Sequence, residues 1–198
     1  MKKILMTLAA VFCCAMTTTV FTACGSDSDD SSDPPAALEF MGVATRYYIV
    51  VDSMMTELCD YTLTYYGEDN KLVTEQMKWT YDKSVKGCSW TKDVTSIVMP
   101  AIVGAKMTVK LKEGAQLEGK RVGNYRPIVK RMYVTGLNKD RSTAFERLLD
   151  IGETSISFGG SAEKIPAQIE LWEQHNGVIN SSYIINQNSA VTSNGKIE

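Results

Sequence analysis

The chain offers few residues for catalytic or metal chemistry. Its one histidine, His175, lies in the polar segment Glu173-Gln174-His175-Asn176-Gly177. A histidine can activate a serine nucleophile, but no Gly-x-Ser-x-Gly turn is present to hold one. A single histidine also rules out a zinc site made from His and Cys clusters, and no glycine-rich phosphate loop opens a helix. We therefore expect no metal and no cofactor, and a surface turn at His175.

Pairs of carboxylates are the remaining catalytic candidates, because two carboxylates can hydrolyse a glycosidic bond. Asp150 with Glu153, or Glu170 with Glu173, could form such a pair. Spacing along a strand does not fix the distance across a sheet, and a glycosidase usually needs a deeper cleft than a small β-domain provides. We predict that the protein is not an enzyme.

The N-terminal residues predict export. Lys2 and Lys3 precede an uncharged apolar run at positions 4–20, and small residues follow it. This order is typical of a secretory signal. A membrane-spanning helix is the alternative, since residues 4–23 are just long enough to cross a bilayer. Residues 4–23 contain five threonines and are followed by aspartates rather than basic residues, which favours a cleaved signal over residues 1–23.

The tetrad Phe21-Thr22-Ala23-Cys24 resembles the lipobox of bacterial lipoproteins. The resemblance implies cleavage before Cys24 and a lipid on its sulfur, so that Cys24 begins the mature chain and anchors it in a membrane. The mature chain then has 198 − 23 = 175 residues, which is enough for one domain with an ordinary core.

The segment after the anchor, residues 24–38, is expected to be a disordered tether. Positions 25–33 contain only glycine, serine and aspartate, too little apolar surface to fold. They resemble the acidic stretch behind the lipid cysteine in surface-exposed lipoproteins of Bacteroides-type bacteria. The resemblance implies an outer-membrane location at the cell surface, with the periplasmic face as the alternative. A calcium loop starting at Asp27 is disfavoured, because Ser32 and Leu38 replace the glycine and glutamate of an EF-hand.

Two cysteines remain in the mature domain, Cys59 and Cys88, since Cys13 and Cys14 leave with the signal. An even pair in an oxidising compartment favours a disulfide. Two buried free thiols are the alternative.

Apolar residues recur with a period of two from residue 39 onward, which predicts strands. We expect strands in segments 46–51, 61–66, 73–81, 89–99, 106–112, 125–135, 156–158, 167–172 and 178–186, and a helical turn at 54–58. Thr143 and Glu146 form a capping-box pattern that predicts one short helix over 143–149, with a strand over 144–149 as the alternative. The pattern predicts an all-β fold for residues 39–198, an antiparallel β-sandwich of immunoglobulin-like layout, with a β-barrel as the alternative.

Exposed aromatic and basic residues are the candidates for a binding surface. Trp90, Trp172, Tyr133 and Arg131 are predicted to form it, because aromatic rings with polar tips suit a sugar or a protein partner. The segment 106–147 carries eleven basic and four acidic residues. We interpret this excess as solvated strand faces, with binding of an acidic glycan or a lipid headgroup as the alternative. An exported protein is not expected to bind nucleic acid. The predicted function is a membrane-anchored, non-enzymatic module that binds a glycan or a protein. A structural subunit that assembles by strand addition is the alternative.

Overall fold

The computed structural model of the chain describes residues 40–120, 123–124, 127–151 and 159–198. The predicted signal, Cys24, the tether, the expected strand 156–158 and Glu153 lie outside these residues. The described residues belong to one compact unit, residues 37–198.

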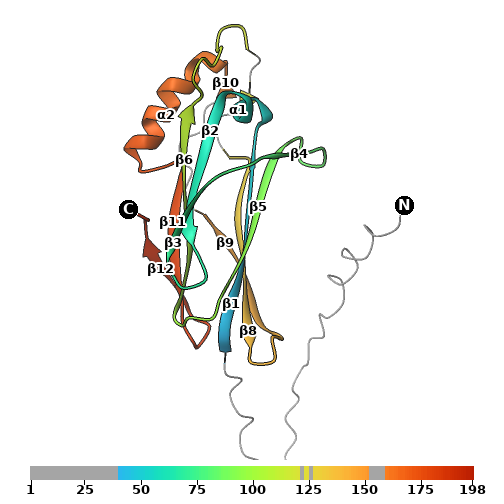
Figure 1. Cartoon of the computed structure of the whole chain (residues 1–198), viewed down its shortest axis with the longest axis vertical. Coiled ribbons are helices and arrows are strands. Elements are labelled where there is room, and N and C mark those ends of the chain that lie inside the picture. Colours follow the sequence, from blue (N-terminus) through green and yellow to red (C-terminus); the bar gives the residue numbers. More distant parts are fainter. Residues whose placement is uncertain (1–39, 121–122, 125–126, 152–158) are drawn as a thin grey trace, which may run out of the picture. The chain divides into compact units, whose positions relative to one another are not determined.

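Two five-stranded antiparallel sheets pack face to face (Figure 1). Sheet 1 has the order β4 (Thr80–Asp82), β5 (Gly87–Ser96), β1 (Phe40–Val51), β8 (Val129–Asn138) and β9 (Thr143–Asp150). Sheet 2 has the order β12 (Val191–Gly195), β11 (Ile179–Ile185), β6 (Ala101–Leu111), β2 (Cys59–Tyr66) and β3 (Leu72–Gln76). A third, two-stranded pair joins β7 (Gly123–Asn124) to β10 (Gly159–Gly160). The two large sheets are separate, so the predicted sandwich is confirmed and the barrel alternative is wrong.

Three helical segments complete the described structure. They are α1 (Ser53–Leu58), η1 (Ala162–Lys164) and α2 (Ile165–Gln174). The turn expected at 54–58 is confirmed as α1, which begins where the Asp52 carboxylate accepts a hydrogen bond from the Met54 amide at 2.8 Å. Such a cap satisfies an amide that the first helical turn leaves without a partner.

Strand alternation builds the core. In the central strands every second side chain points between the sheets and is buried, as with Ile49 in β1, Leu63 in β2, Met107 in β6 and Met132 in β8. Tyr47 of β1 reaches across to the other sheet, where its hydroxyl accepts from the Gly104 amide at 3.3 Å. Its burial raises the pKa of this tyrosine well above the ordinary value.

The run predicted as one strand at 73–81 changes sheets. Its first half is β3, at the edge of sheet 2, and its second half is β4, at the edge of sheet 1. Between them Met77 is buried and donates its amide to Tyr61 O at 2.9 Å, and the Trp79 ring packs edge-on against Tyr61 with centroids 5.1 Å apart. A continuous alternating pattern does not reveal such a crossing, because both halves keep the same period.

The helix predicted at 143–149 is wrong, because this segment is strand β9. It pairs with β8 in a hairpin whose turn is closed by the Asn138 amide, which donates to Ser142 O at 2.9 Å. Phe145 and Leu149 pack against the core from this strand. A helix cap contributes only about 1 kcal/mol, less than a ladder of backbone hydrogen bonds with apolar packing.

The strand predicted at 167–172 is also wrong, because this segment lies in helix α2. Pro166 stands in the first turn of the helix, where its missing amide hydrogen is not needed. Ile165, Ile169 and Trp172 recur at helical spacing and are buried. Helix α2 lies beside the part of β6 that extends beyond its pairing with β11 (Figure 1).

Candidate functional site

The outer face of sheet 1 carries the most distinctive surface among the described residues. Strand alternation turns Tyr48 of β1, Arg131 and Tyr133 of β8, and Leu148 of β9 away from the core. We call these four side chains the tyrosine face. Arg131 lies opposite Tyr48, and Tyr133 lies opposite Leu148. Tyr133 is 41% exposed and Leu148 is 54% exposed. The face therefore offers aromatic, cationic and aliphatic groups on adjacent strands.

An ion pair borders the tyrosine face. Arg46, which lies opposite Tyr133, donates from Nε to Asp93 Oδ1 at 2.7 Å and from Nη2 to Asp93 Oδ2 at 3.0 Å. The hydrogen bonds from Arg46 lower the pKa of Asp93, and the carboxylate in turn raises the pKa of Arg46. The two-point geometry fixes the Arg46 guanidinium over β5.

Arg131 differs from Arg46 in having no such partner. Arg46 pairs with Asp93, Lys71 with Asp69 and Lys92 with Glu75, whereas Arg131 forms no ion pair with another described residue. Asp150 stands opposite Arg131 in the ladder, but no ion pair forms between them in this part of the chain. The Arg131 guanidinium thus keeps its donors for solvent or a ligand.

Tyr48 is half-buried beside these groups. Burial is the main cause that raises the pKa of Tyr48, and the nearby Asp82 and Tyr133 raise it further. Its phenol therefore stays neutral at physiological pH and can both donate and accept a hydrogen bond. Two tyrosines on adjacent strands, with an arginine beside them, offer apolar ring faces and polar tips.

Two of the four predicted binding residues belong to the core instead. Trp90 is 7% exposed, because it lies on the inward side of β5 opposite Ile49. Trp172 is 4% exposed on the buried side of α2. The prediction of an exposed Trp172 assumed strand parity, whereas helical spacing places it with the apolar residues. The other two predicted residues, Tyr133 and Arg131, lie on the surface and on the same strand face.

The structure adds Tyr48, Leu148 and the Arg46–Asp93 pair, which the sequence analysis did not select. The alternation of Arg46, Tyr47 and Tyr48 could have placed two of them on one strand face. Their proximity to Tyr133 depends on the register between β1 and β8, which single-strand periodicity does not specify.

The expected disulfide is a further correction. Cys59 and Cys88 are both buried free thiols in the structure. Cys59 begins β2 in sheet 2, whereas Cys88 lies in β5 of sheet 1, and the Cys88 sulfur is 3.4 Å from the Thr56 hydroxyl. Burial raises the pKa of Cys59 to about 12, although nearby Lys112 lowers it. A thiol so protonated is a poor nucleophile.

The remaining chemical candidates are exposed side chains. His175 is exposed in the turn after α2, as predicted. Glu170 and Glu173 are exposed on the same helix. Within the described ranges, no group of three or more His, Cys, Asp and Glu side chains is placed to hold a metal ion. Lys110 points outward from sheet 2, whereas Arg131 points outward from sheet 1, so the basic excess of 106–147 is divided between two faces.

Comparison of the chain with protein-family models, curated proteins and solved structures finds no match. The fold defines an all-β sandwich, and the immunoglobulin-like layout within that class stays a prediction.

Proposed function

We propose that this chain is an exported, lipid-anchored protein whose β-sandwich binds a glycan through the tyrosine face. The observation that carries the binding proposal is the placement of Tyr48, Tyr133 and Arg131 side by side on one open sheet face. Sugar rings have apolar faces that stack on aromatic rings, and their hydroxyls accept hydrogen bonds from a guanidinium. Half-buried Tyr48, exposed Tyr133 and Arg131 supply both kinds of contact.

The location rests on the N-terminal residues. The signal pattern, the lipobox-like tetrad ending at Cys24 and the acidic tether support anchoring at the outer membrane, at the cell surface or at its periplasmic face. In the described part of the chain, no helix is both long and apolar enough to cross a membrane.

Binding of the mature protein to immobilised neutral and acidic oligosaccharides tests the proposal. Tyr133→Ala and Arg131→Ala are expected to lower affinity at least ten-fold for any glycan bound by the native protein, since hot-spot side chains contribute about 2 kcal/mol or more. Lys110→Ala is the matched control, because Lys110 is an exposed strand cation on the other sheet. Equal affinity of all four proteins would refute binding at this face. If Tyr133→Ala and Arg131→Ala instead lost binding to an envelope protein, the partner of this face would be a protein.

A structural subunit is the second candidate, and one observation favours it. Strand β9 spans eight residues at the edge of sheet 1, and among the described strands it pairs with β8 alone. An unpaired strand edge can accept a strand from another chain. Oligomers that form with increasing concentration or resist sodium dodecyl sulfate would support this function. A monomer at all accessible concentrations would exclude self-assembly.

A further inference from the structure

One end of the sandwich presents aliphatic side chains to solvent. The loop between β5 and β6 carries Ile97, which is 77% exposed, and Val98, which is 39% exposed. Met41, the second residue of strand β1, is 43% exposed. Burying a side chain such as isoleucine would contribute about 1.5–3 kcal/mol, so leaving these groups in water is unfavourable. Their exposure indicates that these side chains contact something other than the rest of the domain.

Hydrogen bonds hold this loop in shape. The hydroxyl of buried Ser96 accepts from the Val98 amide at 3.3 Å. Asn70, from the turn between β2 and β3, donates to Pro100 O at 2.9 Å and accepts from the Ile102 amide at 2.8 Å. The loop is thus fixed on both sides, and Ile97 and Val98 remain outside the core.

The exposed loop lies where the tether joins the domain. Gly42 packs against it so closely that a Cβ at this position would lie 2.7 Å from Ser96 O and 3.4 Å from Ile97 Cα. Gly42 is two residues beyond Phe40, the first described residue of β1. The tether therefore meets the sandwich at the same end as Ile97.

The length of the tether sets how far this end can lie from the lipid. From Cys24 to Phe40 the chain has sixteen steps, which span at most about 50–60 Å when fully extended. A flexible chain of this length has an average end-to-end distance of roughly 20–25 Å. A lipid on Cys24 would thus keep Ile97 close to the bilayer at a high effective concentration.

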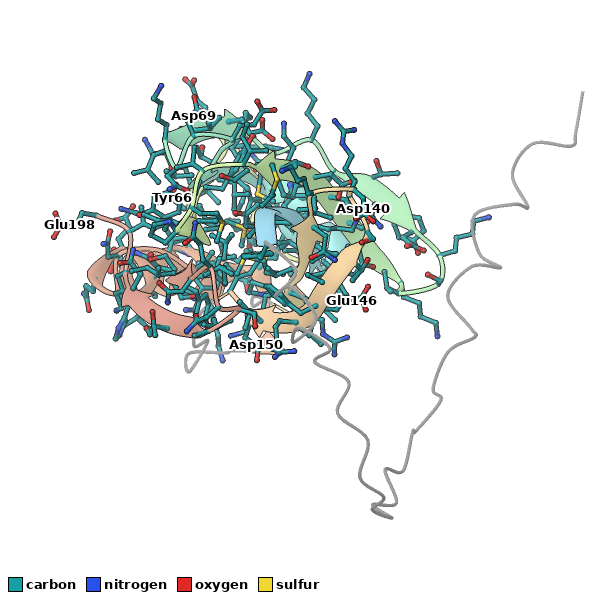
Figure 2. All side chains as sticks on the ribbon, turned by 90° about the horizontal axis from the view of Figure 1, so that it is seen from below. Tyr66, Asp69, Asp140, Glu146, Asp150 and Glu198 are labelled. Carbon is teal, nitrogen blue, oxygen red and sulfur yellow. The ribbon has the colours of Figure 1, made fainter. Side chains whose placement is uncertain are left out.

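Charge does not oppose contact with the bilayer at this end. The turns beside the loop carry Lys71, Lys139 and Arg141 together with Glu68, Asp69 and Asp140. Figure 2 views the domain from this end and labels Asp69 and Asp140 in their two turns. The charges of these six residues sum to zero, so aliphatic insertion rather than attraction to anionic lipid would drive the contact.

From these observations we infer that the Ile97–Val98 loop inserts into the headgroup region of the membrane that carries the lipid on Cys24. This inference rests on the proposed lipid anchor. The sandwich then stands with its tether end on the membrane, and its long strands extend away from the surface. The tyrosine face, which lies along the side of the sandwich, stays accessible to a ligand.

The test uses the full lipidated protein in vesicles of neutral phosphatidylcholine, with Ile97→Cys labelled by an environment-sensitive nitrobenzoxadiazole dye. Thr91→Cys, at an exposed position in the middle of β5, is the matched control. Flotation with the vesicles reports the anchor, and fluorescence reports the loop. We expect the dye at position 97 to shift to the blue, to be quenched by lipids with a quencher near the headgroup, and to be at least three-fold less accessible to aqueous iodide than the dye at position 91.

Two results would overturn the inference about the loop alone. One is a protein that floats with the vesicles while positions 97 and 91 are quenched equally by iodide. The other is a blue shift at position 97 that is already present without vesicles, which would show that the chain itself covers the loop. A protein that does not float would refute the lipid anchor, and the inference with it. Ile97→Asp with Val98→Asp, unlabelled, is expected to float normally, since the lipid alone holds it.

Discussion

Arg46 and Asp93 form a two-point ion pair across β1 and β5, with an Nε–Oδ1 distance of 2.7 Å and an Nη2–Oδ2 distance of 3.0 Å. The pair separates the roles of the two arginines that flank Tyr133. Arg46 is held by a carboxylate, whereas Arg131 has no ion-pair partner among the described residues. Arg131, which we assign to the ligand, is therefore the one of these two arginines that the described residues leave without an ion pair.

Removal of this ion pair is expected to lower the stability of the fold slightly and in a pH-dependent way. Because Arg46 lowers the pKa of Asp93, the pair stabilises the fold above the pKa that Asp93 has in the unfolded chain, about 3.9, and this stabilisation is lost as the pH falls through the lower folded-state pKa. Arg46→Ala should lower the free energy of unfolding by about 0.2–1 kcal/mol at pH 7, since both partners are largely exposed.

Urea denaturation at pH 7 and near pH 2 checks this prediction. The difference between Arg46→Ala and the native protein should shrink at the lower pH. Arg131→Ala is the control, with less than about 0.5 kcal/mol expected at either pH. A pH-independent loss in Arg46→Ala would contradict an ion-pair effect.

The side chain of Asn180 replaces backbone pairing at the C-terminal end of the chain. Its amide donates to Ile197 O at 2.8 Å and to Asn176 O at 2.9 Å, and its oxygen accepts from the Ile197 amide at 2.7 Å. Asn180→Ala leaves the buried Ile197 amide without this acceptor, although Ile197 O still accepts from the Asn176 side chain at 3.1 Å, and the loss should cost about 1–3 kcal/mol. Chemical denaturation measures this decrease in the free energy of unfolding, and Gln187→Ala, at an exposed position, is the control. Equal stability of the two variants would show that these bonds contribute nothing net.

Gln168 is the opposite case, a buried amide without hydrogen bonds. It is 1% exposed on α2, and neither its nitrogen nor its oxygen has a partner among the residues that the structure describes. Gln168→Met keeps the length of the side chain and the helix propensity while removing the unsatisfied groups. We expect the melting temperature to rise by a few degrees, measured by circular dichroism. A fall would show that the amide makes hydrogen bonds in solution.

The two buried cysteines should behave as protected thiols. Because burial raises the pKa of Cys59 to about 12, almost no thiolate is present at pH 8. The lipidated mature protein should react slowly with a thiol reagent when native, and should give two thiols per chain when denatured without reductant. The Cys59→Ser variant should give one. A native-sequence protein that gives none would demonstrate a disulfide.

The sequence predicted the sandwich because alternation is a local property. In β1, β2 and β6 the buried residues recur at every second position, so strand and face could be assigned together. The turn at α1 was predictable for a similar reason, since Asp52 caps it two residues away. Not every local signal was interpreted correctly, because the helical spacing of Ile165, Ile169 and Trp172 in α2 was taken for a strand.

Features that depend on contacts between residues distant in the sequence were also missed. Thr143 and Glu146 match a local helix cap, but pairing with β8 decides the outcome. Trp172 was assigned to an exposed face because a strand was assumed around it, although a helix buries it with Ile165. For the candidate site, periodicity placed Tyr133 and Arg131 outward. The neighbouring Tyr48 required the register of β1 against β8.

The central claim is that the sandwich is held on a membrane by Cys24 and works outside the cell. Protease treatment of intact cells tests it most directly, using the native precursor, Cys24→Ala, and a version in which Asp27, Asp29, Asp30 and Asp33 are asparagine. We predict that the native domain is digested, that the asparagine version is protected, and that Cys24→Ala is not recovered as a surface protein attached to the membrane. Protection of the native protein, together with both variants, would contradict surface exposure.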